Sequence, residues 1–267
     1  MKKIIYKITK YVPFVIAIIL LSSFSVYVNQ EEVNADEVMK KVQASILSHG
    51  DYKVEEIMTL IRSNGKSYSR NMVSFHKEVD KKEDFSLKIF NTPKDVKGTK
   101  SLIHSYLSKD DNQWIYFPSI NATKRIANEN KSGSFMGSEF ANEDLGTMAL
   151  FKSRFEFIEI KEYNDVECFV IRSYPKNKYS GYKFIDLFIT TDNYLPIFQN
   201  MYNRKGKHFK DVDIEWKRFK DEFWLIENIS VENLKNKRKT TLKRFNFQFD
   251  DTYSVSFFDS ENIANVE

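Results

Sequence analysis

The sequence offers few side chains that could hold a metal ion or act as a nucleophile. Its four histidines, His49, His76, His104 and His208, are scattered, and none stands at ligand spacing from another histidine, a cysteine or a carboxylate pair. Cys168, the single cysteine, lies in a stretch expected to be a strand, where a lone cysteine is usually a small core residue. We therefore expect no metal, no cofactor and no catalytic cysteine.

Three acidic residues are the remaining candidates for acid–base chemistry. Glu139, Glu143 and Asp144 lie close together in a long irregular segment, residues 128–147. A solvated acidic loop explains them without catalysis, and the sequence contains neither a Gly-x-Ser-x-Gly turn nor a Gly-rich phosphate loop. We expect a protein that is not an enzyme, and a hydrolase acting through these carboxyl groups is kept as a third hypothesis.

The same segment carries large apolar side chains where a loop is expected to be polar. Phe135, Met136 and Phe140 stand beside Gly133 and Gly137, which allow bends that other residues resist. Apolar residues on a flexible loop suit a lid over an apolar cavity, because Met and Phe adapt to irregular hydrocarbon chains. The residues alone leave open the alternative that these side chains only anchor the loop to the core.

A long series of β-strands is predicted around this loop. One helix comes first, since Asn34 and Glu37 have capping-box spacing and apolar residues follow at helical period as far as Leu47. From Tyr52 the hydrophobic period is two, and Asn64-Gly65 is a strong hairpin signal between the first two strands. About a dozen strands joined by tight turns predict an antiparallel meander, and hence a mainly β protein.

The composition indicates wide apolar faces on these strands. The chain has 23 Phe, 14 Tyr and 3 Trp but only 8 Gly and 5 Pro, and Phe245, Phe247 and Phe249 are assigned to one face of the last strand. A long meander must bury such a face by closing on itself, by packing on a second sheet or by folding around a helix. Because the one predicted helix covers only part of it, apolar surface is left for a ligand.

The N-terminus predicts export. Lys2, Lys3, Lys7 and Lys10 precede an uncharged, mostly apolar run over residues 11–28, which is typical of a signal peptide. Small residues before position 36 offer a cleavage site, so residues 1–35 are assigned to the signal and residues 36–267 to a single β domain. An uncleaved membrane anchor is the alternative, because a membrane-spanning helix needs about 20 apolar residues.

Charge gives no reason to expect nucleic acid as a partner. The chain carries 41 basic and 37 acidic side chains, and loss of residues 1–35 removes four basic and two acidic ones, which leaves a nearly neutral domain. Residues 235–244 are locally basic. This segment could touch anionic lipid headgroups or an acidic partner, and an ordinary hairpin with basic flanks explains it as well.

Several strings of residues carry a family resemblance. They are residues 91–99 (NTPKDVKGT), 111–118 (DNQWIYFP), 124–126 (KRI), 133–140 (GSFMGSEF) and 143–145 (EDL). In this order the chain resembles the outer-membrane lipoprotein-sorting protein family, relatives of the periplasmic lipoprotein carrier of Gram-negative bacteria. The resemblance extends over most of residues 36–258. It implies a strongly curved antiparallel sheet, an incomplete (half) β-barrel, with a few helices covering its concave apolar face.

The resemblance also implies a function. We expect a periplasmic, monomeric carrier that binds the acyl chains of a lipid or acylated lipoprotein and moves it toward the outer membrane, with an inner-membrane exporter of the resistance-nodulation-division type as a partner. The alternative is an adaptor or sensor of the same fold that docks on an envelope protein complex. The expected ligand contacts are the lid residues Phe135, Met136 and Phe140 and the wall residues Met58, Leu60, Trp114 and Tyr116.

Overall fold

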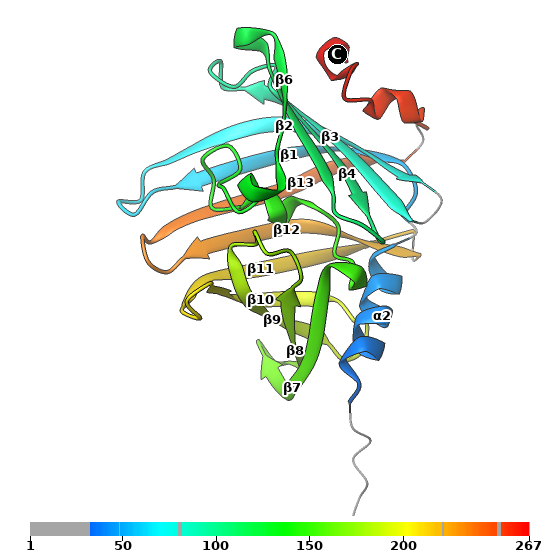
Figure 1. Cartoon of the computed structure of the whole chain (residues 1–267), viewed down its shortest axis with the longest axis vertical. Coiled ribbons are helices and arrows are strands. Elements are labelled where there is room, and N and C mark those ends of the chain that lie inside the picture. The colour runs from blue at the N-terminus through cyan, green and yellow to red at the C-terminus, as the bar shows by residue number, and fades with distance from the viewer. Residues whose placement is uncertain (1–32, 48, 80–81, 221, 250–251, 267) are drawn as a thin grey trace, which may run out of the picture. The chain divides into compact units, whose positions relative to one another are not determined.

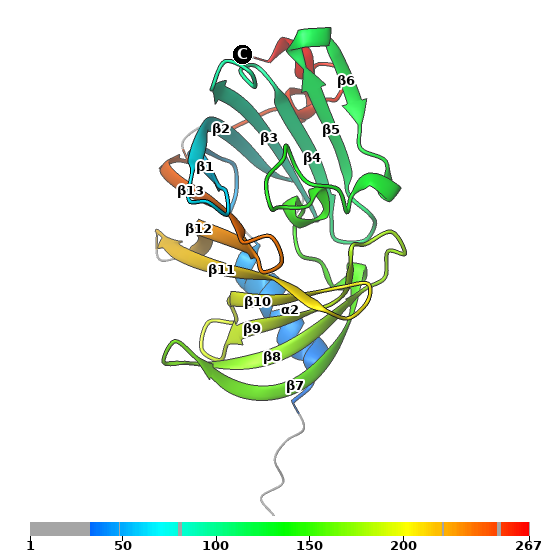
Figure 2. The ribbon, with the colours of Figure 1, turned by 90° about the vertical axis from the view of Figure 1, so that its left-hand side faces the viewer.

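One continuous, curved antiparallel sheet dominates the computed structural model (Figures 1 and 2). The structure describes residues 33–47, 49–79, 82–220, 222–249 and 252–266. Most of the predicted export signal, residues 1–32, therefore lies outside the described residues. Among the residues that are described, no helix is long and apolar enough to span a membrane.

The elements follow one another in a simple order. Helix α2 spans Ala35–Ile46. The strands are β1 (Tyr52–Ile61), β2 (Ser67–Val79), β3 (Glu83–Thr92), β4 (Lys100–Tyr106), β5 (Asn112–Phe117), β6 (Ala122–Arg125), β7 (Ser153–Tyr163), β8 (Val166–Pro175), β9 (Tyr182–Thr190), β10 (Pro196–Asn203), β11 (His208–Phe219), β12 (Phe223–Asn233) and β13 (Arg238–Gln248). Short 3-10 turns are η1 (Pro118–Ile120), η2 (Asn128–Asn130), η3 (Asn142–Leu145), η4 (Leu150–Lys152), η5 (Val255–Phe258) and η6 (Ile263–Asn265).

The sheet is open, and this confirms the predicted half-barrel. Its strand order is β6-β5-β4-β3-β2-β1-β13-β12-β11-β10-β9-β8-β7, with every neighbouring pair antiparallel. Two meanders, β1–β6 and β7–β13, are joined where β1 pairs with β13. The two edge strands, β6 and β7, are consecutive in the sequence, so the connection between them must cross the open side of the sheet.

Helix α2 begins as the sequence predicts. The side chain of Asn34 accepts hydrogen bonds from the backbone N–H groups of Asp36 at 2.9 Å and Glu37 at 3.2 Å, which satisfies two of the free N–H groups at the helix start. Its apolar stripe buries Val38, Met39 and Val42. The helix packs against β7 and β12 and covers one end of the concave face (Figure 1).

Strands β2–β5 bury side chains on both faces, because both faces are covered. Their concave face contributes Met72, Phe90 and Ile115 to the main core. Their outer face packs against the C-terminal residues 252–266, which bury Phe258 and Ile263 there. Double coverage explains why β4 has almost no exposed residue.

One prediction about the last strand is wrong. Phe247 and Phe249 pack together near Phe219 with ring centroids 4.6 Å and 5.3 Å from it, but Phe245 does not belong to this cluster. The backbone of Asn246 has a positive φ of 53°, and the pairing of β13 with β1 shifts register there. This bulge breaks the two-residue period, so Phe245 and Phe247 do not share a face.

Candidate functional site

The concave face is occupied by the connection between β6 and β7. Residues 126–152 leave one edge strand, enter the hollow of the sheet and return to the other edge (Figures 1 and 2). We call residues 133–142 the inner hairpin, because they form a small antiparallel hairpin inside this connection with a bridge between Ser134 and Ala141. The predicted lid residues all lie on the inner hairpin.

A tight turn shapes the inner hairpin. Phe135 N–H donates to the carbonyl of Phe140 at 2.8 Å, and Ser138 N–H donates back to the carbonyl of Phe135 at 2.9 Å. The two central residues, Met136 and Gly137, have φ values of 49° and 76°. This turn requires left-handed backbone at both positions, which explains the glycine at 137.

The turn directs two phenylalanines into the core. Phe135 is 1% exposed and Phe140 is 3% exposed, and both belong to the main apolar cluster. That cluster contains residues from both meanders, for example Phe90 of β3 and Val212 of β11. The inner hairpin therefore connects the two halves of the sheet by apolar contact.

Polar contacts hold the tip of the inner hairpin from two sides. Arg70 of β2 donates to the carbonyl of Met136 at 2.6 Å. Arg238 at the start of β13 donates to the carbonyl of Gly137 at 3.1 Å and pairs with the Glu139 carboxylate at 3.1 Å. The side chain of Arg238 is 41% exposed, so this ion pair lies at the surface although Glu139 is buried.

The two other acidic residues act as hydrogen-bond acceptors. Asp144 accepts from Ala141 N–H and from the Tyr182 hydroxyl, each at 2.7 Å, and Glu143 accepts from Gly181 N–H at 2.8 Å. Burial raises the pKa of both carboxyl groups, against the opposing effect of their hydrogen bonds. These contacts give the predicted acidic cluster a structural role in seating the connection, which supplies a non-catalytic reason for its presence.

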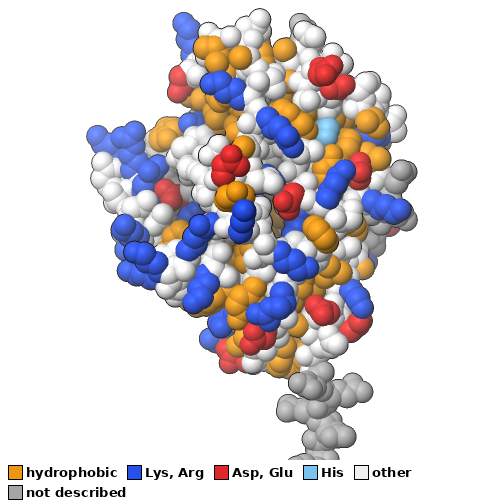
Figure 3. Space-filling view, in the orientation of Figure 1, with side chains coloured by type: hydrophobic (Ala, Val, Ile, Leu, Met, Phe, Trp, Pro, Cys, Tyr) orange, Lys and Arg blue, Asp and Glu red, His pale blue; other side chains and the backbone are white. Residues whose placement is uncertain are grey.

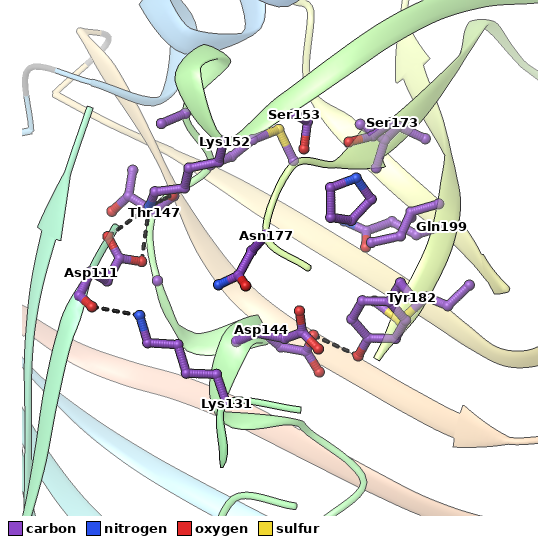
Figure 4. A pocket seen from close by; sticks show the side chains of 18 of the residues that line it. Asp111, Lys131, Asp144, Thr147, Lys152, Ser153, Ser173, Asn177, Tyr182 and Gln199 are labelled. Atoms are coloured by element: carbon purple, nitrogen blue, oxygen red, sulfur yellow. Dashed lines mark hydrogen bonds and ion pairs between the residues drawn. The ribbon is translucent and has the colours of Figure 1, made fainter. Parts of the chain in front are cut away.

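A first cavity of about 230 Å³ lies between the connection and strands β8–β12. Its floor is apolar and includes Phe140, Leu187 and Val231. Figure 4 shows a polar side of this cavity, with Lys131 and Lys152 both directed at Asp111. Lys152 Nζ lies 2.7 Å from the Asp111 carboxylate, and Lys131 donates to the Asp111 carbonyl at 2.6 Å.

A second cavity of about 250 Å³ lies on the other side of the same connection, toward β1, β12, β13 and α2. The two cavities share lining residues, among them Phe140, Met148 and Ile229. Phe140 and the residues after it thus divide one apolar hollow into two chambers. Together the chambers reach the lower part of the ~300–1,000 Å³ range of small-molecule pockets.

The second cavity is apolar at one end and charged at the other. Met58, Ile214 and Leu242 line the apolar end. Lys88 and Arg244 line the charged end, where both hold the fully buried Glu56 carboxylate, at 2.7 Å and 2.9 Å. Burial alone would raise the pKa of Glu56, but the two cations outweigh it and lower this pKa, so the carboxylate stays ionised.

A buried histidine completes the charged end. His76 stacks on Tyr52 with ring centroids 4.3 Å apart, and its Nε2 has no hydrogen-bond partner. Burial, together with the charges of Lys88 and Arg244, lowers the pKa of His76 well below its usual value, so the ring is neutral. This end of the cavity therefore combines two cations that are paired with Glu56 and a neutral imidazole with a free ring nitrogen.

The structure brings together most of the predicted ligand contacts but not all. Phe135, Met58 and Leu60 are buried in the main core beside Phe140, and Met136 packs at its margin. Phe135 and Met58 line the second cavity, whereas Leu60 lines neither chamber.

Trp114 and Tyr116 are placed elsewhere. They project from the outer face of β5 and pack in the cluster beneath the C-terminal residues, while Ile115 between them faces the concave core. Trp114 and Tyr116 therefore do not line either chamber, and inward-facing residues of other strands form the walls. Alternation located the two faces of β5, but both faces are apolar, so it could not say which one is concave.

Sequence reasoning missed the buried ions. Glu56 belongs to the same alternating series as Tyr52, Val54, Met58 and Leu60, and a carboxylate inside an apolar series was the available signal. Its partners Lys88 and Arg244 are distant in the sequence and could not be assigned to it without the sheet order.

The structure holds no sign of metal or thiol chemistry where it is described. Across the described ranges, no group of three or more His, Cys, Asp or Glu residues could hold a metal ion. Cys168 is buried, and burial raises the pKa of its thiol to about 11, which leaves it protonated and unreactive at neutral pH.

Comparisons with known proteins agree with this architecture. The model of a family described as "Uncharacterized protein" matches residues 82–265. An outer membrane lipoprotein-sorting protein domain from Vibrio parahaemolyticus is 31% identical with a TM-score of 0.83, over 86% of this chain and 98% of the other. No curated protein matches the chain.

Two further solved structures are similar. A DUF1329 family protein from Desulfovibrio piger is 25% identical with a TM-score of 0.77, over 85% of this chain and 96% of the other. A LolA superfamily protein from Nitrosomonas europaea is 15% identical with a TM-score of 0.67, over 85% of this chain and 98% of the other. The latter similarity shows a shared fold.

Proposed function

The chain belongs to the outer-membrane lipoprotein-sorting protein family, and on that premise we propose that it is a carrier that binds the acyl chains of a lipid or acylated lipoprotein in its concave hollow. The observation that supports this most is the inner hairpin, which fills the hollow with two phenylalanines of the chain itself. A hollow that is largely apolar, divided and filled by a loop of the chain itself suits a ligand that takes the place of that loop.

Binding of such a ligand is favourable and still reversible in this proposal. Each methylene group transferred from water into the hollow contributes about 0.8 kcal/mol. Against this, the loop must give up its own apolar contacts and the polar contacts of Arg70 and Arg238 at its tip. Because the ligand and the inner hairpin compete for the same surface, binding is weaker than the buried area alone implies, and release needs no large input of energy.

The charged end of the second cavity orients the ligand in this proposal. Acyl chains would lie against Met58, Phe135 and Leu242, and the polar headgroup would lie near Lys88 and Arg244. An amphiphile matches both ends of the chamber, because its polar part can add hydrogen bonds to Lys88 and Arg244 beside those they make with Glu56, whereas a plain hydrocarbon adds none.

The remaining expectations belong to the same proposal. The protein would work as an exported, periplasmic monomer, with its N-terminal segment cleaved or kept as a tether. It would move its cargo toward the outer membrane, and an inner-membrane exporter of the resistance-nodulation-division type would supply that cargo. It would bind rather than transform the lipid, without a cofactor or metal.

Native mass spectrometry tests the proposal directly. Protein comprising residues 34–267, which retains the capping residue Asn34, is purified without detergent and weighed before and after solvent extraction. We expect a mass excess that resolves into phospholipid or another acylated species. A ligand-free mass, with no uptake of added phospholipid or fatty acid, contradicts the carrier function.

A cavity-blocking variant locates the ligand. Ile229 on β12 lines both chambers, so Ile229→Trp places a large side chain where the acyl chains would lie. Thr241→Trp on the outer face of the neighbouring strand β13 is the matched control. We expect the first variant to lose bound lipid and the second to keep it. Equal lipid content in both folded variants would place the lipid outside the hollow.

One observation favours the alternative of an adaptor. The edge strand β7 is long, and Ile158 and Ile160 on it are exposed by 36% and 47%. An open edge of this kind can accept a strand from a protein partner. Copurification of a stoichiometric protein partner with ligand-free protein would favour this function over the carrier.

A further inference from the structure

Four hairpins, one at every second strand pair along the sheet, turn at the same end of the strands. Strands β2, β1, β13, β12, β11, β10, β9 and β8 are neighbours in this order, so the turns 62–66, 234–237, 204–207 and 176–181 all lie at one end of the strands. Figure 2 looks at this end, and it shows the tips side by side along the curve of the sheet. We call these four turns the tip row.

The tip row is purely basic. It contains nine exposed basic side chains and no acidic one: Arg62, Lys66, Lys176, Lys178, Arg204, Lys205, Lys207, Lys235 and Lys237. In the part of the chain that the structure describes, none of the nine forms an ion pair. Figure 3 shows Lys and Arg side chains gathered along the left-hand edge of the molecule, where the turns 62–66, 234–237 and 204–207 lie.

The opposite ends of the same strands differ in charge. Their described turn residues include the exposed Asp165, Asp192 and Glu222, beside Lys82 and Lys220. A domain that is nearly neutral overall thus has a separation between a purely basic end and an end of mixed charge, which no composition count can reveal. Such a separation orients the molecule in the field of a charged surface.

Exposed rings accompany the basic side chains. Tyr68 beside the first tip is 38% exposed and Tyr179 in the last is 39% exposed. The Arg62 guanidinium lies 5.9 Å from the ring of Tyr68, and Lys178 lies 4.9 Å from the ring of Tyr179. Tyrosine next to lysine or arginine is typical of residues that sit at the headgroup level of a bilayer.

We propose that the tip row docks the protein on an anionic membrane surface, with lipid phosphate groups as the partners of its lysines and arginines. Eight strands at ~4.8 Å spacing spread the tips over roughly 30 Å, several times the ~8 Å screening length of physiological salt. One compact acidic site on a protein cannot neutralise charges so far apart, whereas a plane of anionic headgroups meets all the tips at once.

Docking on a membrane also affects the inner hairpin, and this second part of the proposal rests on the proposed carrier function. Arg238 directly follows the tip at 234–237 and is one of the side chains that hold Gly137 and Glu139, beside Asn233 and Lys210. A lipid phosphate near this tip competes with the Glu139 carboxylate for the Arg238 guanidinium. Contact with the membrane therefore loosens the inner hairpin at the place where lipid would enter or leave.

Vesicle flotation tests the docking itself. Protein comprising residues 34–267 is mixed with vesicles of phosphatidylcholine alone or of phosphatidylcholine with phosphatidylglycerol, at low and physiological salt. We expect it to float only with the anionic vesicles and to be released as salt increases. Flotation is scored without reference to bound cargo, so a protein that takes up no added lipid but still floats contradicts the carrier and leaves the docking intact.

Charge reversal assigns the binding to the tip row. The test variant is Lys205→Glu, Lys207→Glu and Lys235→Glu, and the matched control is Lys40→Glu, Lys82→Glu and Lys109→Glu at exposed sites away from the tips. Each basic residue near an anionic surface contributes roughly fivefold in affinity, so the test variant should bind at least ~100-fold more weakly. The control, with the same change in net charge, should bind within severalfold of the unmodified protein.

Two outcomes overturn the proposal. Equal losses in the test and control variants would mean that only net charge matters. Failure to float with anionic vesicles, combined with salt-dependent binding of polyglutamate through the same lysines, would assign the tip row to an acidic protein partner. Circular dichroism of each variant before flotation ensures that a misfolded protein is not counted in either outcome.

Discussion

Replacement of Phe140 by alanine should join the two chambers and reveal their purpose. Phe140 is the buried side chain of the inner hairpin that lines both cavities, of about 230 Å³ and 250 Å³. Truncation removes most of the partition between them. In the carrier proposal, the space created is space that an acyl chain can occupy.

The expected magnitude has two parts. Loss of a buried phenylalanine side chain lowers the free energy of unfolding of the ligand-free protein by about 3–5 kcal/mol. An acyl chain that places about five methylene groups in the new space recovers about 4 kcal/mol, at ~0.8 kcal/mol for each. Added fatty acid or phospholipid should therefore stabilise Phe140→Ala by several kcal/mol more than it stabilises the unmodified protein.

The assay is urea unfolding followed by fluorescence, with and without ligand. Phe90→Ala is the matched control, because Phe90 is fully buried in the same cluster but lines neither chamber. The ring centroids of Phe90 and Phe135 are 6.2 Å apart. We expect both variants to lose similar stability without ligand. Only Phe140→Ala should regain it with ligand.

Equal stabilisation of both variants by the ligand, or of neither variant, contradicts a role for the chambers in ligand binding. Equal rescue would mean that the ligand binds a general apolar surface. No rescue, in a protein that loses the expected stability, would mean that the chambers are packing defects and hold no ligand. Replacing both Phe135 and Phe140 by serine is less informative, because both are core residues and the fold itself should be destabilised.

Three further outcomes follow from the contacts of the site. Glu56→Gln leaves the cation of Lys88 buried without its counter-charge and should lower the unfolding free energy by about 3–5 kcal/mol. A loss below about 1 kcal/mol, measured by urea titration, would contradict this. The pKa of His76 is depressed in the folded state, so the stability that depends on its neutral ring is present above the usual pKa of 6.5 and is lost as the pH falls below it. The loss in unfolding free energy should approach ~1.4 kcal/mol per pH unit and should be absent in His76→Phe. Identical pH profiles of stability in the two proteins would contradict this prediction. Arg238→Ala removes the ion pair with Glu139 and the hydrogen bond to Gly137. It should speed amide hydrogen exchange in residues 135–140, while exchange in β9 stays unchanged.

Local pattern was sufficient to predict much of this protein. The two-residue period and the turn signals predicted a mainly β meander, and Asn34 and Glu37 marked the start of the helix. The apolar residues of the connection, Phe135 and Phe140, identified the segment that covers the hollow. These features could be predicted because each depends on neighbours within a few residues.

Pattern failed where a strand is covered on both sides or is irregular. In β5, Trp114 and Ile115 are both apolar, since the C-terminal residues cover one face and the core covers the other. Periodicity separates two faces but does not say which is concave. In β13, the bulge at Asn246 broke the period itself.

The sequence by itself determined that the chain is built from antiparallel strands, that a long apolar loop interrupts them and that its charge is nearly balanced. Only the tertiary structure decided that the loop fills the hollow, that Glu56 meets Lys88 and Arg244, and that four distant turns form one basic row. The physical reason is the same in each case. Strand formation is local, whereas burial, ion pairing and charge separation depend on which distant strands the sheet places side by side.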